Sequence, residues 1–131
     1  MTRHILVVDD EPQIRDLLSV YLTKQGYRVS TAADSVETVK ALDGGGIDLV
    51  VLDIGLAKED GLKLLARIKA EHENILVVML TGMGFVEDLL QEAHQKGADG
   101  YVSKVLPVTE LLTAIERTFG TANDTAAVAR G

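Results

Sequence analysis

Three acidic residues follow directly after two short apolar runs, in a pattern that suits a metal ion. Asp9 and Asp10 come after the run 5–8 (ILVV), and Asp53 comes after the run 49–52 (LVVL). Each run is short, continuous and rich in β-branched residues, which predicts a buried strand of a parallel sheet. Ligands bind beyond the carboxyl ends of such strands. If the two strands are neighbours, the carboxylates meet at one edge, where Mg²⁺ or Mn²⁺ would neutralise them.

Two further polar side chains are expected at the same edge. Thr81 follows the apolar run 75–80, and Lys104 follows a short strand predicted at 100–103. The acids can hold a metal that neutralises phosphate oxygens, while the hydroxyl and the ammonium can stabilise other phosphate oxygens. A remaining carboxylate can act as a nucleophile and form an aspartyl phosphate. The set therefore predicts a site for phosphoryl transfer.

Strand and helix patterns alternate along the chain. Strands are predicted at 5–8, 28–31, 49–52, 75–80 and 100–103, and helical patterns at 14–22, 36–42, 62–68, 86–93 and 108–119. Strict alternation favours an α/β fold, in which a five-stranded parallel sheet carries helices on both faces. Asp34 is predicted as the N-cap of the second helix, with Val36, Val39 and Leu42 directed inward.

Length and charge restrict the classes of protein. The 131 residues suit one domain, assigned to 1–120, while 121–131 show no apolar period and are predicted to be a flexible tail or a linker remnant. The net charge of −7 argues against direct binding to nucleic acid or to a membrane surface. The apolar runs are too short for a membrane span, no signal peptide is recognisable, and cysteine is absent. These features predict a soluble, cytoplasmic protein.

The ordered set of strand-end residues resembles the receiver domain of two-component response regulators, the group that includes single-domain chemotaxis regulators. The matching segments are 5–11, 49–53, 78–82 and 97–104, and the resemblance covers residues 4 to 119. It implies a flavodoxin-like sheet with strand order 2-1-3-4-5, which agrees with the alternation of elements.

The resemblance implies roles for the residues at the sheet edge. Asp53 would be the phosphoacceptor, and Asp9, Asp10, Asp53 and the backbone carbonyl of Gly55 would hold Mg²⁺ or Mn²⁺. The donor would be a phosphohistidine of a sensor histidine kinase or of a histidine phosphotransfer protein. The chain would then be a signalling module with magnesium-dependent self-phosphorylation and autodephosphorylation, and not an enzyme with an outside substrate.

The phosphoryl oxygens would be bound by a second group of residues. Thr81, Gly82 and Lys104 would contact these oxygens, with the backbone N–H groups of Ile54, Gly55 and Gly82 completing the cradle.

The resemblance also implies a switch. Phosphorylation would draw the Thr81 hydroxyl toward the phosphate and turn Tyr101 inward behind it. This movement would repack the face made by the helix at 86–93, the strand at 100–103 and the helix at 108–119. A downstream output protein or a second copy of the chain would dock on that face.

The chain departs from the family pattern after the lysine, and its residues also bear on two other classes of protein. The lysine is usually followed by a cis proline, but here Val105 follows Lys104, and we predict a trans bond with a shifted loop. This departure leaves open a degenerate receiver that binds partners regardless of phosphate.

A haloacid dehalogenase-like phosphatase needs an Asp two residues after the nucleophile, where this chain has Gly55. A flavin carrier is disfavoured because the acids would repel its phosphate.

Overall fold

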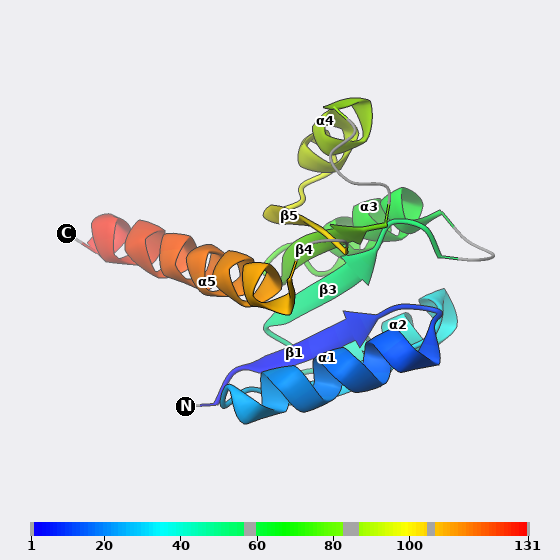
Figure 1. Cartoon of the computed structure of the whole chain (residues 1–131). Helices are drawn as coiled ribbons and strands as arrows, with labels where there is room; N and C mark the ends of the chain where they lie inside the picture. Colours follow the sequence, from blue (N-terminus) through cyan, green and yellow to red (C-terminus); the bar gives the residue numbers. More distant parts are fainter. Residues whose placement is uncertain (1, 57–59, 83–86, 105–106, 131) are drawn as a thin grey trace.

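A central parallel sheet lies between two layers of helices (Figure 1). The computed structural model describes residues 2–56, 60–82, 87–104 and 107–130, with side chains described up to residue 120. The strands are β1 (His4–Val8), β2 (Arg28–Ala32), β3 (Leu49–Asp53), β4 (Leu76–Thr81) and β5 (Gly100–Ser103). The helices are α1 (Pro12–Lys24), α2 (Ser35–Asp43), α3 (Gly61–Glu71), α4 (Glu87–Gln95) and α5 (Val108–Arg130).

The strand order is β2-β1-β3-β4-β5, and every described pair is parallel. The α/β fold with order 2-1-3-4-5 is therefore confirmed. The register aligns the carboxyl ends of the strands, because Val8 lies opposite Leu52, and Thr81 lies opposite Ser103. The last residues of β3 and β4 and the residues that follow β1 and β5 consequently reach one edge of the sheet.

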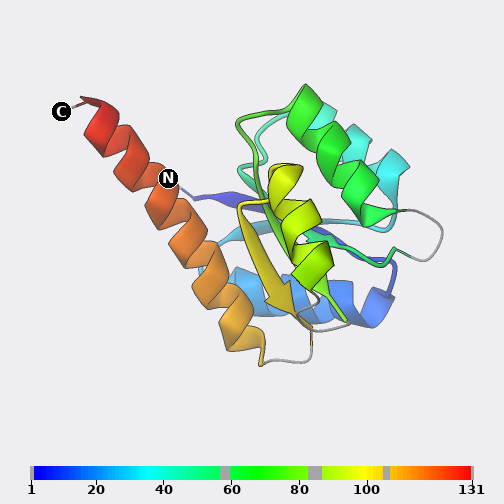
Figure 2. The ribbon, with the colours of Figure 1, turned by 90° about the horizontal axis from the view of Figure 1, so that it is seen from above.

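Alternate residues of the buried strands point to opposite faces and build two cores. On one face the strands pack with side chains of α2, α3 and α4, and on the other with side chains of α1 and α5. Figure 2 shows both layers from above. Burial on both faces explains why β1, β3 and β4 are continuous apolar runs without polar alternation.

The predicted cap of α2 is confirmed, but one inward position is wrong. The Asp34 side chain accepts a hydrogen bond from the Glu37 N–H at 2.9 Å, as an N-cap should. Val36, predicted to face inward, is 74% exposed, whereas Thr38 is fully buried and bonds back to the Asp34 carbonyl. The helix contacts β1 and β2. Its helical period alone did not determine which of its residues are covered.

The last helix is longer than the sequence predicts. Its apolar period ends at Phe119, yet α5 continues to Arg130 and projects beyond the sheet (Figures 1 and 2). The predicted helical bound at residue 119 is therefore too short. The segment is rich in alanine, the strongest helix former, which favours a helix without an apolar stripe. The division into a 1–120 domain and a tail remains a prediction.

No helix in the described parts of the chain combines the length and the apolar character of a membrane span.

Candidate functional site

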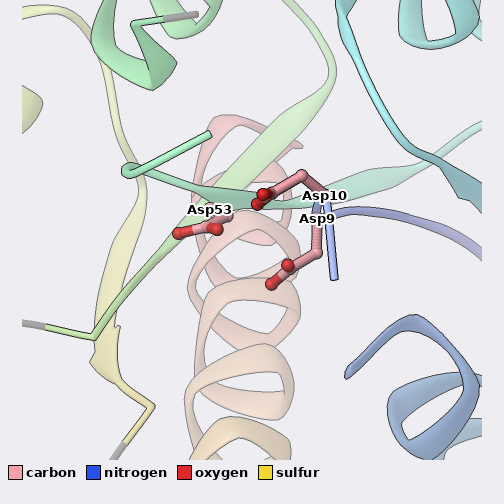
Figure 3. A group of neighbouring side chains, drawn as sticks. All are labelled: Asp9, Asp10 and Asp53. Atoms are coloured by element: carbon pink, nitrogen blue, oxygen red, sulfur yellow. The ribbon is translucent and has the colours of Figure 1, made fainter. Parts of the chain in front are cut away.

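The three predicted acids converge at the carboxyl edge of the sheet. Oxygen atoms of Asp9, Asp10 and Asp53 lie within 4.8 Å of one another, and Figure 3 shows the side chains clustered together. Asp9 is fully buried and Asp53 is 3% exposed. They meet because β1 and β3 are hydrogen-bonded neighbours that end at the same level. The spatial prediction on which the sequence argument depends is confirmed.

Lys104 inserts its ammonium between two of these carboxylates. Its Nζ lies 2.8 Å from Asp9 Oδ2 and 3.0 Å from Asp53 Oδ2, with Glu11 Oε1 at 3.5 Å. A backbone hydrogen bond of 2.7 Å from the Lys104 N–H to the Thr81 carbonyl places the residue at the end of β5. Burial alone lowers the pKa of Lys104, but the contacts with Asp9 and Asp53 outweigh it and raise that pKa. The lysine thus remains charged and partly neutralises the acids.

Asp53 is held by hydrogen bonds to both of its carboxylate oxygens. Oδ1 accepts a 3.0 Å hydrogen bond from the Gly55 N–H, and Oδ2 accepts one from Lys104. Burial raises the pKa of Asp53; the Gly55 and Lys104 hydrogen bonds lower it, the nearby Asp9 raises it further, and the net direction is upward. An ionised Asp53 therefore needs additional positive charge.

The arrangement fits a hard divalent cation. Asp9 Oδ2 is shielded from solvent, and no group in the described part of the chain is aligned to donate a hydrogen bond to it. Lys104 Nζ forms an ion pair with this oxygen at 2.8 Å. Carboxylate oxygens are the ligands that Mg²⁺ and Mn²⁺ prefer. Asp9, Asp10 and Asp53 together thus form a candidate site for such an ion.

The chain matches a model of a known protein family. A family model of the response regulator receiver domain matches residues 5–116, a range that contains every residue of the site. The chain belongs to the response regulator receiver domain family. The resemblance inferred from the strand-end residues is thereby confirmed.

Two curated relatives of this receiver domain differ in how much of their own length it covers. The transcriptional regulatory protein TcrA of Mycobacterium tuberculosis is 40% identical over 111 residues, which cover 85% of this chain and 44% of TcrA. Sporulation initiation phosphotransferase F of Bacillus subtilis is 33% identical over 117 residues, which cover 89% of this chain and 94% of that protein. The receiver domain thus spans less than half of TcrA and nearly all of the sporulation protein.

Solved structures show the same fold. NtrX of Brucella abortus superposes with a TM-score of 0.90 at 36% identity, over 99% of this chain and 29% of NtrX. The chemotaxis protein CheY4 of Vibrio cholerae superposes with a TM-score of 0.85 at 26% identity, over 90% of this chain and 99% of CheY4.

The other predicted site residues of the receiver domain lie around the acids. Thr81 ends β4 and is fully buried, and the exposed Gly82 follows it. A Cβ atom added at Gly82 would lie 3.9 Å from Lys104 Cδ. Tyr101 on β5 is half-buried, packs against the core on the α3 and α4 side, and lines a cavity of about 190 Å³ beside α4. The phosphate-binding and switching roles of these residues remain predictions. The predicted trans bond between Lys104 and Val105 lies outside the described residues.

The structure also corrects and extends the predicted site of the receiver domain. The Ile54 N–H donates to the Leu80 carbonyl at 2.8 Å, so the prediction that it is an available phosphate donor is wrong in this structure. Two contacts were missed: Glu11 lies near Lys104, and Arg15 Nη1 donates a 2.7 Å hydrogen bond to the Asp9 carbonyl. The available signals were a charged residue at the N-cap of the helix that follows the strand-end acids, Glu11, and a second charged residue four positions later, Arg15.

The raised pKa of Asp53 predicts a pH dependence of stability in metal-free buffer. A carboxyl group whose pKa is raised by folding contributes stability that is fully present below its pKa in the unfolded chain, 3.8. This contribution is lost as the pH rises through the pKa of the folded state. The Asp53→Asn variant lacks this titration. We expect the unfolding free energy of the unmodified chain, relative to that of Asp53→Asn, to fall as pH rises from 3.8. Urea denaturation across pH 4–7 measures this difference, and a difference that rises with pH would contradict the assignment.

Proposed function

We propose that this receiver domain accepts a phosphoryl group on Asp53 from a phosphohistidine of a sensor kinase or a histidine phosphotransfer protein. The observation that carries the proposal is the convergence of three acids within 4.8 Å around a lysine that contacts two of them. In such a site the carboxylate is held in place before the reaction, which is the main requirement of phosphoryl transfer.

The reaction needs few groups. An Asp53 carboxylate oxygen would attack phosphorus, the P–O bond would form as the P–N bond breaks, and the imidazole would leave. Lys104, already beside Asp53 Oδ2 at 3.0 Å, would stabilise the phosphoryl oxygens together with Thr81 and Gly82. Mg²⁺ or Mn²⁺, held by Asp9, Asp10, Asp53 and the Gly55 carbonyl, would supply charge neutralisation. Water would later hydrolyse the acyl phosphate, which returns Asp53 and releases inorganic phosphate, so no outside substrate is transformed.

Intact-mass measurement tests this proposal directly. The protein is incubated with acetyl phosphate and Mg²⁺, and we expect a gain of the mass of one phosphoryl group. Addition of a chelator before the donor should prevent the gain. No gain with any small donor would refute the proposal and favour a receiver that binds partners regardless of phosphate.

The receiver would act in the cytoplasm. Phosphorylation would change the face made by α4, β5 and α5. Thr81 stands at the end of β4 beside the site, and Tyr101 lines the cavity against α4 together with Leu90 and His94. Added charge at Asp53 would bias this face between two packings. An output protein or a second copy of the chain would recognise the changed face.

A phosphohistidine donor must cover the rim of the site to reach Asp53. Beside Lys104 lies a mostly apolar cavity of about 110 Å³ between α1 and α5, lined by Leu17, Leu18 and Val108 among others. Leu17 is 55% exposed although it follows the apolar period of α1. An exposed leucine that lines the same cavity as Lys104 favours this rim as the donor's docking surface.

Leu17→Ala is expected to slow phosphotransfer from a histidine-phosphorylated protein that modifies the unmodified chain. Loss of one apolar interface contact costs about 1–2 kcal/mol, roughly a 5–30-fold reduction in transfer efficiency. The rate with acetyl phosphate should stay unchanged because a small donor needs no docking. Val20 is the matched control, since it is equally exposed on α1 at 55% and does not line the cavity. Equal transfer rates for Leu17→Ala and Val20→Ala would contradict this docking surface.

A further inference from the structure

Gly61, the first residue of α3, has no room for a side chain. A Cβ atom there would lie 2.5 Å from the Asp53 carbonyl oxygen and 2.7 Å from both the Cα and the carbonyl oxygen of Ile54. All three are backbone atoms, which cannot rotate away as the end of a flexible side chain can. Gly61 is not among the glycines with a positive φ, so glycine is required here by space and not by backbone conformation.

The backbone that Gly61 contacts is also held on its other side. The Ile54 N–H donates to the Leu80 carbonyl at 2.8 Å, and Asp53 is in register with Leu80. A further hydrogen bond of 3.3 Å runs from the Gly61 N–H to the Ile54 carbonyl. The peptide between Asp53 and Ile54 is therefore confined between β4 and the first turn of α3.

The first turn of α3 has little freedom to move away. The Asp60 side chain caps the helix by accepting a 2.9 Å hydrogen bond from the Leu62 N–H. Leu62 is 5% exposed and Leu65 is fully buried, and both belong to the core on that face of the sheet. A group added at Gly61 would consequently displace the Asp53–Ile54 backbone or pull buried leucines out of the core.

We propose that Gly61 is a positioning residue for Asp53: its close contact with the Asp53–Ile54 backbone fixes where the Asp53 carboxylate stands relative to Lys104 and Gly55. Both of those contacts are 3.0 Å long, so a backbone shift of a few tenths of an ångström lengthens them. The effect on phosphorylation rests on the proposed function, whereas the effect on the position of the carboxylate does not.

The test is Gly61→Ala, which adds one methyl group. The first measurement is amide hydrogen exchange at Gly55, whose N–H donates to Asp53 Oδ1. We expect this exchange to become at least tenfold faster. The second is the rate of mass gain with saturating acetyl phosphate and Mg²⁺, which we expect to fall at least tenfold.

Two controls separate positioning from loss of stability. Gly44→Ala places a methyl group at the end of α2, where the nearest atom lies at 3.4 Å and φ is −69°. Ile115→Val weakens the core on the opposite face of the sheet. Both should retain the Gly55 exchange rate and the phosphorylation rate. A folded Gly61→Ala that matches the unmodified chain in both measurements overturns the proposal.

Two outcomes need a further comparison. If Gly61→Ala does not fold, Leu62→Ala is used instead, because it loosens the same turn without adding an atom. At least threefold faster amide exchange at Gly55 in Leu62→Ala supports the proposal, and unchanged exchange overturns it. If the unmodified chain gains no phosphoryl group, the proposed function fails. The Gly55 exchange in Gly61→Ala then decides the positioning role independently.

Discussion

Asp53→Asn is expected to abolish the gain of a phosphoryl group from acetyl phosphate or from a phosphohistidine protein. The amide has nearly the shape of the carboxylate but is not a nucleophile under these conditions, so the acyl phosphate cannot form. The fold should persist, because Asp53 lies at the end of β3 and its Gly55 hydrogen bond can be accepted by the amide oxygen. Intact-mass spectrometry measures the loss, and circular dichroism confirms the fold.

Asp43→Asn is the matched control for this variant. Asp43 lies at the end of α2, and its side chain is 65% exposed. It is not part of the acidic cluster. This control should gain the same mass as the unmodified chain. Full phosphorylation of Asp53→Asn would place the phosphoacceptor elsewhere and remove the basis of the proposed function.

Lys104→Met is expected to change stability, metal binding and phosphorylation together. Methionine keeps most of the length of the side chain but removes the ammonium that contacts Asp9 and Asp53, two carboxylates that are 0% and 3% exposed. Breaking such a buried pair costs about 3–5 kcal/mol in metal-free buffer at neutral pH. Loss of one group that stabilises the transferring phosphoryl oxygens should slow phosphorylation by roughly 10²-fold.

The same variant should bind Mg²⁺ about tenfold more tightly or better, because the ammonium no longer repels the metal. Added Mg²⁺ should therefore recover more stability in Lys104→Met than in the unmodified chain. Urea denaturation with and without Mg²⁺, together with calorimetric titration of the metal, measures both effects. Lys24→Met, an exposed change in the last turn of α1, should have neither effect. Weaker Mg²⁺ binding by Lys104→Met would show that the lysine does not compete with the metal.

Short-range patterns identified the strands and the acids. An apolar run such as 49–52 can be buried on both faces only inside a layered sheet, so the run predicts both the strand and the burial. A polar residue directly after such a run must stand at the strand's carboxyl end, which placed Asp9 and Asp53 correctly. The strand order itself came from the family resemblance, because alternation alone does not determine which strands are neighbours.

Contacts between distant parts of the chain were beyond such patterns. Lys104 lies 51 residues from Asp53, and nothing in the local sequence shows that its ammonium rests between Asp9 and Asp53. Val36 has the right helical phase for burial yet is exposed, since the neighbouring elements cover only part of that face. Helical periodicity describes one helix, whereas coverage depends on what packs against it.

The amino-acid sequence by itself determined the order of strands and helices along the chain and the residue types available for phosphoryl chemistry, because these depend on local periodicity and on strand ends. Only the tertiary structure decided which backbone N–H groups are available to donate hydrogen bonds to a phosphoryl group, and which positions tolerate no side chain. The Ile54 N–H is occupied by Leu80, and Gly61 abuts the Asp53 backbone, through packing between elements far apart in the chain. Such packing is set by the whole assembled sheet and its helices, and no single segment encodes it.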